Sequence, residues 1–195
     1  MQTKLVRWTR VLATAGLGLA LAILLSCASG QERWPDVIFV PTPQPVVERM
    51  LELAKVTKND VVYDLGCGDG RIVVTAAKKY GCKAVGFDID PQRVKESLEN
   101  VKKNGVEELV RIEQKDIFTL DLSGASVITL YLLTSLNEKL VPQLQKMKPG
   151  SRVVSHSFEI PGYEPDKVER VNADGFERTI YLYTIPLKKK SQKDD

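Results

Sequence analysis

The distribution of apolar residues divides the chain into an apolar N-terminal run, a long region of alternating strand-like and helix-like segments, and a charged tail. Short continuous apolar runs are typical of buried strands, and apolar residues at every third or fourth position predict helices. The expected strands cover residues 61–65, 84–87, 110–113, 127–132 and 152–155, and the expected helices cover residues 46–54, 72–80, 91–104 and 134–147.

Two further β-rich segments, residues 168–171 and 179–185, predict a terminal hairpin because Asn172-Ala173-Asp174-Gly175 separates them. Strands that alternate with helices imply right-handed crossovers and a twisted parallel sheet covered on both faces. The pattern therefore predicts an α/β fold, doubly wound, with a mostly parallel seven-stranded sheet and a C-terminal antiparallel hairpin. Ligands bind such sheets outside the carboxyl ends of the strands, which places the functional loops after residues 65, 87, 115 and 131.

The pattern favours one folded domain, residues 46–187, flanked by segments without core residues. Residues 31–45 read as an extended linker because Pro35, Pro41, Pro43 and Pro45 punctuate them. Residues 188–195 are expected to be a charged, disordered tail.

Residues 1–30 predict a membrane-directed segment. Three basic residues precede the apolar residues 11–25, a run shorter than the roughly 20 residues that span a bilayer. One interpretation is a signal peptide whose Leu24-Leu25-Ser26-Cys27 resembles a bacterial lipoprotein cleavage box. The other is an uncleaved single anchor. Both predict membrane association through the N-terminal segment.

The side of the membrane is left open by two opposing signals. Basic residues before the apolar run favour a cytoplasmic N-terminus and an exported domain. Cys67 and Cys82 are expected at opposite edges of the sheet, too far apart for a disulfide, and unpaired thiols favour a reducing compartment.

Composition excludes several classes of function. The chain has 195 residues and a net charge of +3, and the basic residues near its ends already account for that surplus, so we expect no nucleic-acid partner. It contains one histidine and three cysteines, without zinc-ligand spacing, so we expect no metal.

The strongest candidate site is the turn Asp64-Leu65-Gly66-Cys67-Gly68-Asp69-Gly70, between an expected strand and an expected helix. Alternating glycines allow close approach of a ligand to the backbone. Arg71 breaks the spacing of a dinucleotide fingerprint, and the acids disfavour a phosphate group. Acids beside the turn suit a cationic ligand without phosphates, and S-adenosylmethionine is such a ligand. The alternative is a tight turn that binds nothing.

Two further strand ends add candidate cofactor contacts. Asp88 ends the second strand, where a carboxylate can accept both ribose hydroxyls, and Ile89 is expected on the adenine. Asp90 is more economically a helix cap. Asp116 is a candidate for the adenine amino group, with Ile117 or Phe118 covering the ring; the alternative for Phe118 is core packing. The candidate cofactor-binding residues are Asp64, Gly66, Cys67, Gly68, Asp69, Gly70, Asp88, Ile89, Asp116 and Ile117.

These motifs together resemble class I S-adenosylmethionine-dependent methyltransferases of the Rossmann-like fold. A narrower resemblance rests on Phe39-Val40-Pro41-Thr42-Pro43, Leu130-Tyr131-Leu132-Leu133-Thr134 and Ser155-His156-Ser157-Phe158. This set is similar to the membrane-anchored protein-lysine methyltransferases of mitochondria, which modify ATP synthase and the adenine nucleotide translocase, and to their prokaryotic relatives. Thr134 departs from that family, in which a proline often follows Tyr-Leu-Leu.

The resemblance implies methyl transfer to a protein lysine, with Tyr131, Thr42 and Pro43 as candidate catalytic residues. Tyr131 is expected on the acceptor side, where it orients the amine; the alternative is a core tyrosine with its hydroxyl paired. Thr42 and Pro43 are expected to form a lid; the alternative is a proline-rich linker without contact to the site. His156 reads as a structural hydrogen-bonding residue near the pocket. The alternatives are a small-molecule or lipid methyltransferase and a non-catalytic domain that binds the cofactor.

Overall fold

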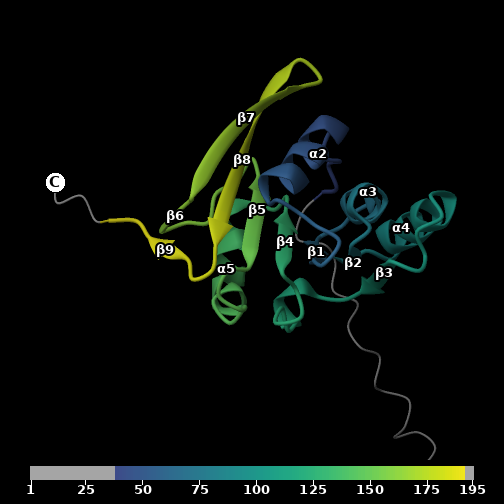
Figure 1. Ribbon diagram of the computed structural model, residues 1–195, viewed down its shortest axis with the longest axis horizontal. Coiled ribbons are helices and arrows are strands. Elements are labelled where there is room, and N and C mark those ends of the chain that lie inside the picture. Colours follow the sequence, from purple (N-terminus) through teal and green to yellow (C-terminus); the bar gives the residue numbers. More distant parts are fainter. Residues whose placement is uncertain (1–37, 192–195) are drawn as a thin grey trace, which may run out of the picture. The chain divides into compact units, whose positions relative to one another are not determined.

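The computed structural model describes residues 38–191, which form one α/β unit (Figure 1). The helices are α2 (Gln44–Leu53), α3 (Arg71–Tyr80), α4 (Pro91–Lys103), α5 (Thr134–Leu144) and the short 3-10 helix η1 (Ile117–Thr119). The strands are β1 (Val61–Leu65), β2 (Lys83–Asp88), β3 (Val110–Gln114), β4 (Val127–Leu130), β5 (Arg152–His156), β6 (Tyr163–Glu164), β7 (Lys167–Ala173), β8 (Phe176–Thr184) and β9 (Lys188–Lys189).

Seven strands form one sheet in the order β3-β2-β1-β4-β5-β8-β7. Strands β1 to β5 are parallel, and β8 runs antiparallel to both of its neighbours. Because these strands are parallel, the loops after β1, β2 and β4 lie at one edge of the sheet, and the strand order reverses there, between β1 and β4. The predicted fold class, including the C-terminal antiparallel hairpin, is confirmed.

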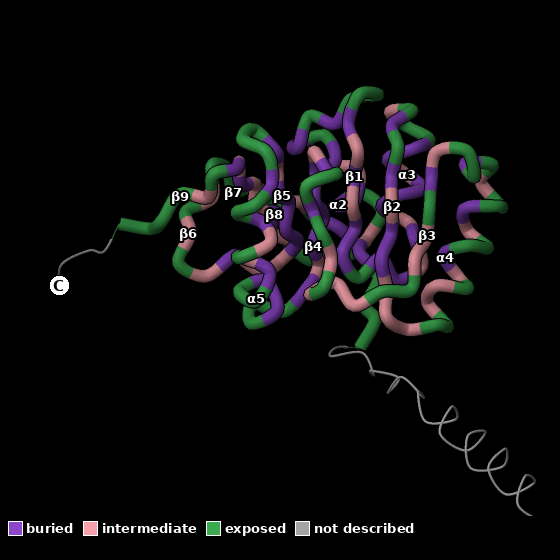
Figure 2. Tube along the Cα trace, turned by 90° about the horizontal axis from the view of Figure 1, so that it is seen from below, coloured by how far each residue is buried: buried purple, intermediate pink, exposed green. Residues whose placement is uncertain are grey.

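Each face of the sheet has its own apolar core, and Figure 2 shows the buried strands between exposed outer segments. Helices α2, α3 and α4 cover one face, with Val46, Val47 and Met50 of α2 fully buried. Helix α5 covers the other face together with η1 and the loop that leads into β4. The crossover from β3 to β4 therefore contains only a 3-10 turn, and its Leu122 and Ala125 fill the core.

Helix α2 is tied to the hairpin as well as to the sheet. The Arg49 guanidinium donates to both carboxylate oxygens of Glu169 on β7, at 2.6 and 2.9 Å. Bidentate pairs of this kind fix geometry as well as charge. Because α2 is held in this way, the residues that precede it are brought to the edge of the sheet where β4 and β5 end.

Strand β8 begins beyond the end of β5, since Ile180 is the partner of His156, the last residue of β5. The first residues of β8 and the last residues of β7 therefore extend past the carboxyl edge of the sheet, as Figure 1 shows for the long β7–β8 hairpin. This hairpin borders the edge at which the candidate loops meet.

The observed boundaries differ from the predicted ones at a few places. Strand β4 ends at Leu130 rather than residue 132, and α5 ends at Leu144 rather than residue 147. The tail was predicted to start at residue 188, whereas Lys188–Lys189 pair with Tyr163–Glu164 as the small sheet β6–β9. A charged two-residue strand has no periodicity that sequence reasoning can detect.

The predicted signal or anchor segment, residues 1–30, lies outside the described residues. Within residues 38–191, none of the helices combines the length and the apolar character needed to cross a bilayer.

Candidate functional site

The glycine turn lies between β1 and α3, folded against the end of β2. The amides of Gly66 and Cys67 both donate to the Phe87 carbonyl at 2.9 Å, and Gly70 donates to Cys67 at 2.9 Å. Gly66, Gly68 and Gly70 have φ values of 81°, 56° and 75°, which residues with side chains rarely adopt. The glycine pattern therefore reflects a backbone requirement of this turn.

Asp88 at the end of β2 is bonded directly to the glycine turn. One carboxylate oxygen accepts from the Gly68 amide at 2.8 Å and the other accepts from the Asp90 amide at 3.0 Å. Burial raises the pKa of Asp88, and these amide bonds counteract the shift. The structure thus brings Asp88 and the glycine turn together, as the sequence predicted.

Asp64 is a buried carboxyl group, and among the described residues it forms no ion pair with a lysine or arginine. Its side chain accepts from the Thr129 hydroxyl at 2.7 Å, and the residue is almost completely enclosed. Burial, together with the smaller effects of the nearby Asp88 and Asp69 charges, raises the pKa of Asp64 to about 7 against the opposing effect of the Thr129 hydrogen bond. A cation at this edge of the sheet would stabilise the ionised carboxylate.

Asp69 has a different environment, because it is paired with the Arg71 guanidinium at 2.6 Å. Arg71 also donates to the Thr42 carbonyl at 2.9 Å. The structure therefore places Asp69 at the glycine turn as expected, but it directs this carboxylate toward an internal cation that holds Thr42.

The Cys67 side chain points into the packing behind the turn. Its sulfur lies 3.6 Å from the Ser97 hydroxyl on α4 and occupies the space beside Gly86 that a Cβ would need. Burial raises the pKa of this thiol. Cys67 therefore contributes its backbone, and not its side chain, to the turn. Cys67 and Cys82 are both buried and do not form a disulfide.

The remaining cofactor candidates lie at the ends of β2 and β3. Ile89 directly follows Asp88, and its carbonyl accepts from the Gln114 amide at 3.2 Å. Asp116 caps η1, accepting from the Phe118 amide at 3.0 Å. Ile117 is partly buried against the core beneath α5, and Phe118 packs there as well. Phe118 thus contributes to core packing, one of the two interpretations of this residue.

On the other side of the turn, an aromatic cluster lies where β4 and β5 end. The Tyr131 ring lies 4.0 Å from the His156 ring and 6.2 Å from the Phe158 ring, measured between centroids. The buried hydroxyl of Thr42 lies 3.3 Å from His156 Nδ1. The structure thus joins Thr42 to Tyr131 through His156, and Pro43 immediately precedes α2.

His156 is fully buried, and its Nε2 atom has no hydrogen-bond partner among the described residues. Burial lowers the pKa of His156 to about 4, with a further contribution from the positive charge of Arg178. The imidazole is therefore neutral at pH 7 and adds no positive charge beside Tyr131.

Two residues of α4 that were not predicted from the sequence support the glycine turn. The Ser97 hydroxyl donates to the Gly68 carbonyl at 2.7 Å, and the Asn100 amide donates to the Asp69 carbonyl at 2.9 Å. Ser97 is completely buried although it is polar. Ser97 and Asn100 lie four residues and one residue before Val101, so they are on or beside the buried face of α4. Polar residues at such positions are the sequence signal that could have identified them.

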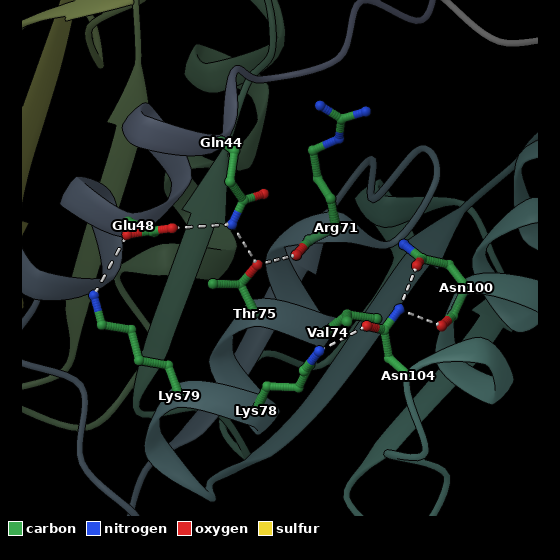
Figure 3. A pocket seen from close by; sticks show the side chains of 9 residues that line it. All are labelled: Gln44, Glu48, Arg71, Val74, Thr75, Lys78, Lys79, Asn100 and Asn104. Carbon is green, nitrogen blue, oxygen red and sulfur yellow. Dashed lines mark hydrogen bonds and ion pairs between the residues drawn. The ribbon is translucent and has the colours of Figure 1, made fainter.

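A groove of about 420 Å³ is lined by side chains of α2, α3 and α4, including Arg71 and Asn100 (Figure 3). Its polar side chains bond to one another: Gln44 donates to the Thr75 hydroxyl at 3.1 Å, and Lys78 donates to Asn104 at 2.9 Å. Figure 3 shows the Arg71 guanidinium pointing away from the other lining side chains. The groove does not include the carboxylates of the candidate site.

The chemistry of the strand-end site fits a cationic nucleoside with hydroxyl groups. The glycine turn presents backbone without side chains, Asp88 presents acceptor oxygens, and the buried Asp64 supplies negative charge. The described residues contain no group of three or more His, Cys, Asp or Glu arranged to hold a metal.

Comparisons with known proteins agree with this geometry. A family model described as the ANTKMT methyltransferase domain matches residues 64–167. A protein-lysine N-methyltransferase of Saccharolobus islandicus (strain REY15A) is 52% identical over 153 residues, covering 77% of this chain and 95% of that protein. The adenine nucleotide translocase lysine N-methyltransferase of Mus musculus is 31% identical, and the match covers 91% of this chain and 83% of that protein.

A solved structure extends the agreement to the bound molecule. The crystal structure of an RNA methyltransferase from Salinibacter ruber in complex with S-adenosyl-L-homocysteine has 49% sequence identity and a TM-score of 0.71, covering 80% of this chain and 99% of that chain. The predictions of an enzyme, of a methyltransferase and of S-adenosylmethionine as its cofactor are confirmed. The chain is an S-adenosylmethionine-dependent methyltransferase and belongs to the ANTKMT methyltransferase domain family.

Proposed function

We propose that this protein transfers the methyl group of S-adenosylmethionine to the ε-amino group of a lysine in a protein substrate. The observation that supports it most strongly is the 52% identity to an archaeal protein-lysine N-methyltransferase across 95% of that protein. The mouse relative acts on a lysine of the adenine nucleotide translocase, as its name states.

We assign the cofactor to the strand-end site. Asp88 would accept hydrogen bonds from the ribose hydroxyls, and the backbone of Gly66, Gly68 and Gly70 would lie against the cofactor. Asp64 would balance its positive charge, while Ile89, Asp116 and Ile117 would surround the adenine. Asp69 would act indirectly, since its bond to Arg71 positions Thr42.

Bound S-adenosylmethionine supplies an electrophilic methyl group on a positively charged sulfur that leaves readily. The protein must align a lysine nitrogen with this methyl group, and alignment alone contributes up to about 7–11 kcal/mol in favourable cases. We assign this role to Tyr131, whose ring is fixed against His156, with Thr42 and Pro43 closing the site.

The lysine must also lose a proton before its nitrogen can attack. An amine that enters an environment of aromatic rings and a neutral imidazole loses hydration, which lowers its pKa. The neutral state of His156 leaves Tyr131 and Phe158 as the principal surface for the amine. The arrangement therefore favours the neutral amine without a dedicated base.

RNA methylation is a second candidate, because the structurally similar Salinibacter protein is described as an RNA methyltransferase. RNA-binding proteins concentrate basic residues on one face. In residues 38–191 acidic and basic residues are nearly balanced, and many of the basic residues are paired with acids, as Arg49 is with Glu169. This balance favours a protein substrate, as does the archaeal relative.

We further propose that the apolar residues 11–25 attach the protein to a membrane, which would bring the domain close to membrane proteins. The support is the sequence: basic residues, an apolar run and Cys27 occur in the order of a lipoprotein signal or a single anchor.

The acceptor proposal predicts the chemical nature of the product. Full-length protein and radiolabelled S-adenosylmethionine are incubated in four separate reactions. The reactions contain, respectively, a cell-membrane protein extract, a soluble protein extract, total RNA and lipid vesicles. We expect label in protein, recovered as methyllysine after acid hydrolysis. Tyr131→Leu should reduce this label by about tenfold or more, because alignment of the amine is lost. Its affinity for S-adenosylhomocysteine, measured by calorimetry, should stay unchanged. Label confined to RNA or lipid would contradict the proposal.

The buried Asp64 predicts that cofactor affinity depends on pH. With a pKa of about 7 in the free protein, Asp64 is mostly protonated at pH 6 and mostly ionised at pH 8. The cationic cofactor favours the ionised form, so S-adenosylmethionine should bind about tenfold more weakly at pH 6 than at pH 8.

Asp64→Asn provides the control for this pH dependence. It should flatten the profile while weakening binding at pH 8. The pKa of Asp64 is higher in the folded protein than in the unfolded chain. Ionisation of Asp64 therefore lowers the free energy of unfolding progressively as the pH rises from about 4 to 7, and this loss of stability persists above pH 7. The variant should therefore melt at a higher temperature than the parent at pH 8. A parent profile that is flat between pH 6 and 8 would refute the assignment.

Asp88→Ala should weaken S-adenosylhomocysteine binding by more than about tenfold, because it removes charge-assisted hydrogen bonds to the ribose. The matched control is Asp90→Ala. Asp90 caps α4 by accepting from the Gln92 amide at 2.8 Å, so this change should cost about 1 kcal/mol of stability and leave binding intact. Calorimetric titration of both variants measures the difference, and equal affinities would remove Asp88 from the ribose site.

The membrane proposal predicts that full-length protein sediments with membranes and resists extraction at high salt. Leu17→Arg combined with Ile23→Arg should release it, since each charge within the apolar run costs roughly 2.5–3.5 kcal/mol. The mass of the purified chain distinguishes cleavage and lipidation at Cys27 from an uncleaved anchor. A parent protein found in the soluble fraction would disprove attachment.

A further inference from the structure

We propose that Phe39, held by Arg93, covers the glycine turn and retains the cofactor, acting as a positioning residue in the segment 38–42, here named the strap. The inference rests on the cofactor site proposed above. It adds a residue that was grouped with the linker in the sequence and that directly borders the site in the structure.

The Phe39 ring is packed against the backbone of Gly68. Three of its ring carbons lie 2.0, 2.6 and 2.9 Å from the position that a Cβ at Gly68 would take, so the ring can approach this closely only because this residue is glycine. The Gly68 amide is at the same time bonded to the Asp88 carboxylate at 2.8 Å. The ring therefore lies against the same residue that binds the carboxylate assigned to the ribose.

Arg93 on α4 provides the second contact of the ring. Its guanidinium carbon lies 5.0 Å from the centre of the Phe39 ring, within the range of a cation–π contact. Arg93 is itself paired with Glu96 at 2.6 Å and lies 3.9 Å from Asp90. The contact thus links the strap to the first turn of α4, directly after the strand end that bears Asp88.

The other end of the strap is fixed as well. The Thr42 carbonyl accepts from Arg71, and the Thr42 hydroxyl contacts His156. The two neighbours of Phe39 in sequence, Ile38 and Val40, are 90% and 57% exposed, whereas Phe39 itself is 36% exposed. Of residues 38–40, Phe39 is the one most covered by the domain.

These contacts give Phe39 two effects on a bound cofactor. An apolar ring against Gly68, whose amide is bonded to Asp88, reduces the access of water to this part of the site and so strengthens hydrogen bonds made there. Phe39 is also 36% exposed, and its neighbours Ile38 and Val40 are more exposed still, so the ring can move aside when the cofactor exchanges. Exchange of the spent cofactor would then require the strap to open at Phe39 while Thr42 stays in place.

The test compares Phe39→Ala with Ile38→Ala in the full-length protein, using S-adenosylhomocysteine as the probe. Phe39→Ala should raise the dissociation rate, followed by stopped-flow fluorescence, and the dissociation constant, measured by calorimetry, by about tenfold, the size expected for losing a partly buried aromatic contact. The single-turnover rate at saturating S-adenosylmethionine should change by less than about threefold, because alignment at Tyr131 is untouched. Ile38→Ala changes a more exposed neighbour and should match the parent in every measurement.

Two further variants separate the cover from a general loss of structure. Arg93→Gln removes the cation while keeping Phe39, and it should raise the dissociation rate less than Phe39→Ala does. Phe39→Leu retains an apolar cover and should restore most of the affinity. Melting temperatures of the cofactor-free proteins verify that each variant is folded.

The outcomes distinguish this inference from the proposed function. Unchanged or tighter binding by Phe39→Ala would overturn the inference, since tighter binding would mean that the ring occupies the space of the cofactor. The cofactor site itself would survive that result if the parent binds normally. A parent protein that does not bind S-adenosylhomocysteine would instead overturn the cofactor site on which both rest.

Discussion

The hydrogen bond from the Gly68 amide to the Asp88 carboxylate is the contact on which the candidate site depends. It joins the turn after β1 to the end of β2, two points that are adjacent only because these strands are parallel and in register from Val61↔Lys83 to Leu65↔Phe87. The bond holds the turn in its left-handed conformations and holds the carboxylate at the strand end. The side chains of Ser97 and Asn100 on α4 donate hydrogen bonds to backbone carbonyls of the same turn and fix it from the helix side.

The electrostatics of this site are unfavourable until a cation is present. Asp64 and Asp88 both have pKa values raised by burial, and the charge of Asp88 adds to the cost of ionising Asp64. Asp69 lies in the same turn but is neutralised by Arg71. The protein thus compensates one of its three acids internally and leaves two for a ligand, which is the arrangement expected where binding energy comes from a cationic cofactor.

The sequence predicted the sheet and the glycine turn because both follow from local patterns. Continuous apolar runs identify buried strands, and glycines that alternate with acids after such a run identify the turn. The contacts of Phe39 with Gly68 and Arg93 could not be predicted in this way, because they join three segments whose proximity depends on how α2 and α4 pack on the sheet. The same applies to Asp69, whose pairing with Arg71 is invisible in a pattern that treats each acid as a potential ligand contact.

The strap connects the two halves of the proposed reaction. Phe39 borders the cofactor side through Gly68, and Thr42, three residues later, reaches the aromatic cluster through His156. In the proposed opening, Phe39 moves aside while Thr42 remains bound to Arg71 and close to His156, so the cofactor can exchange without disturbing the aromatic cluster on the acceptor side.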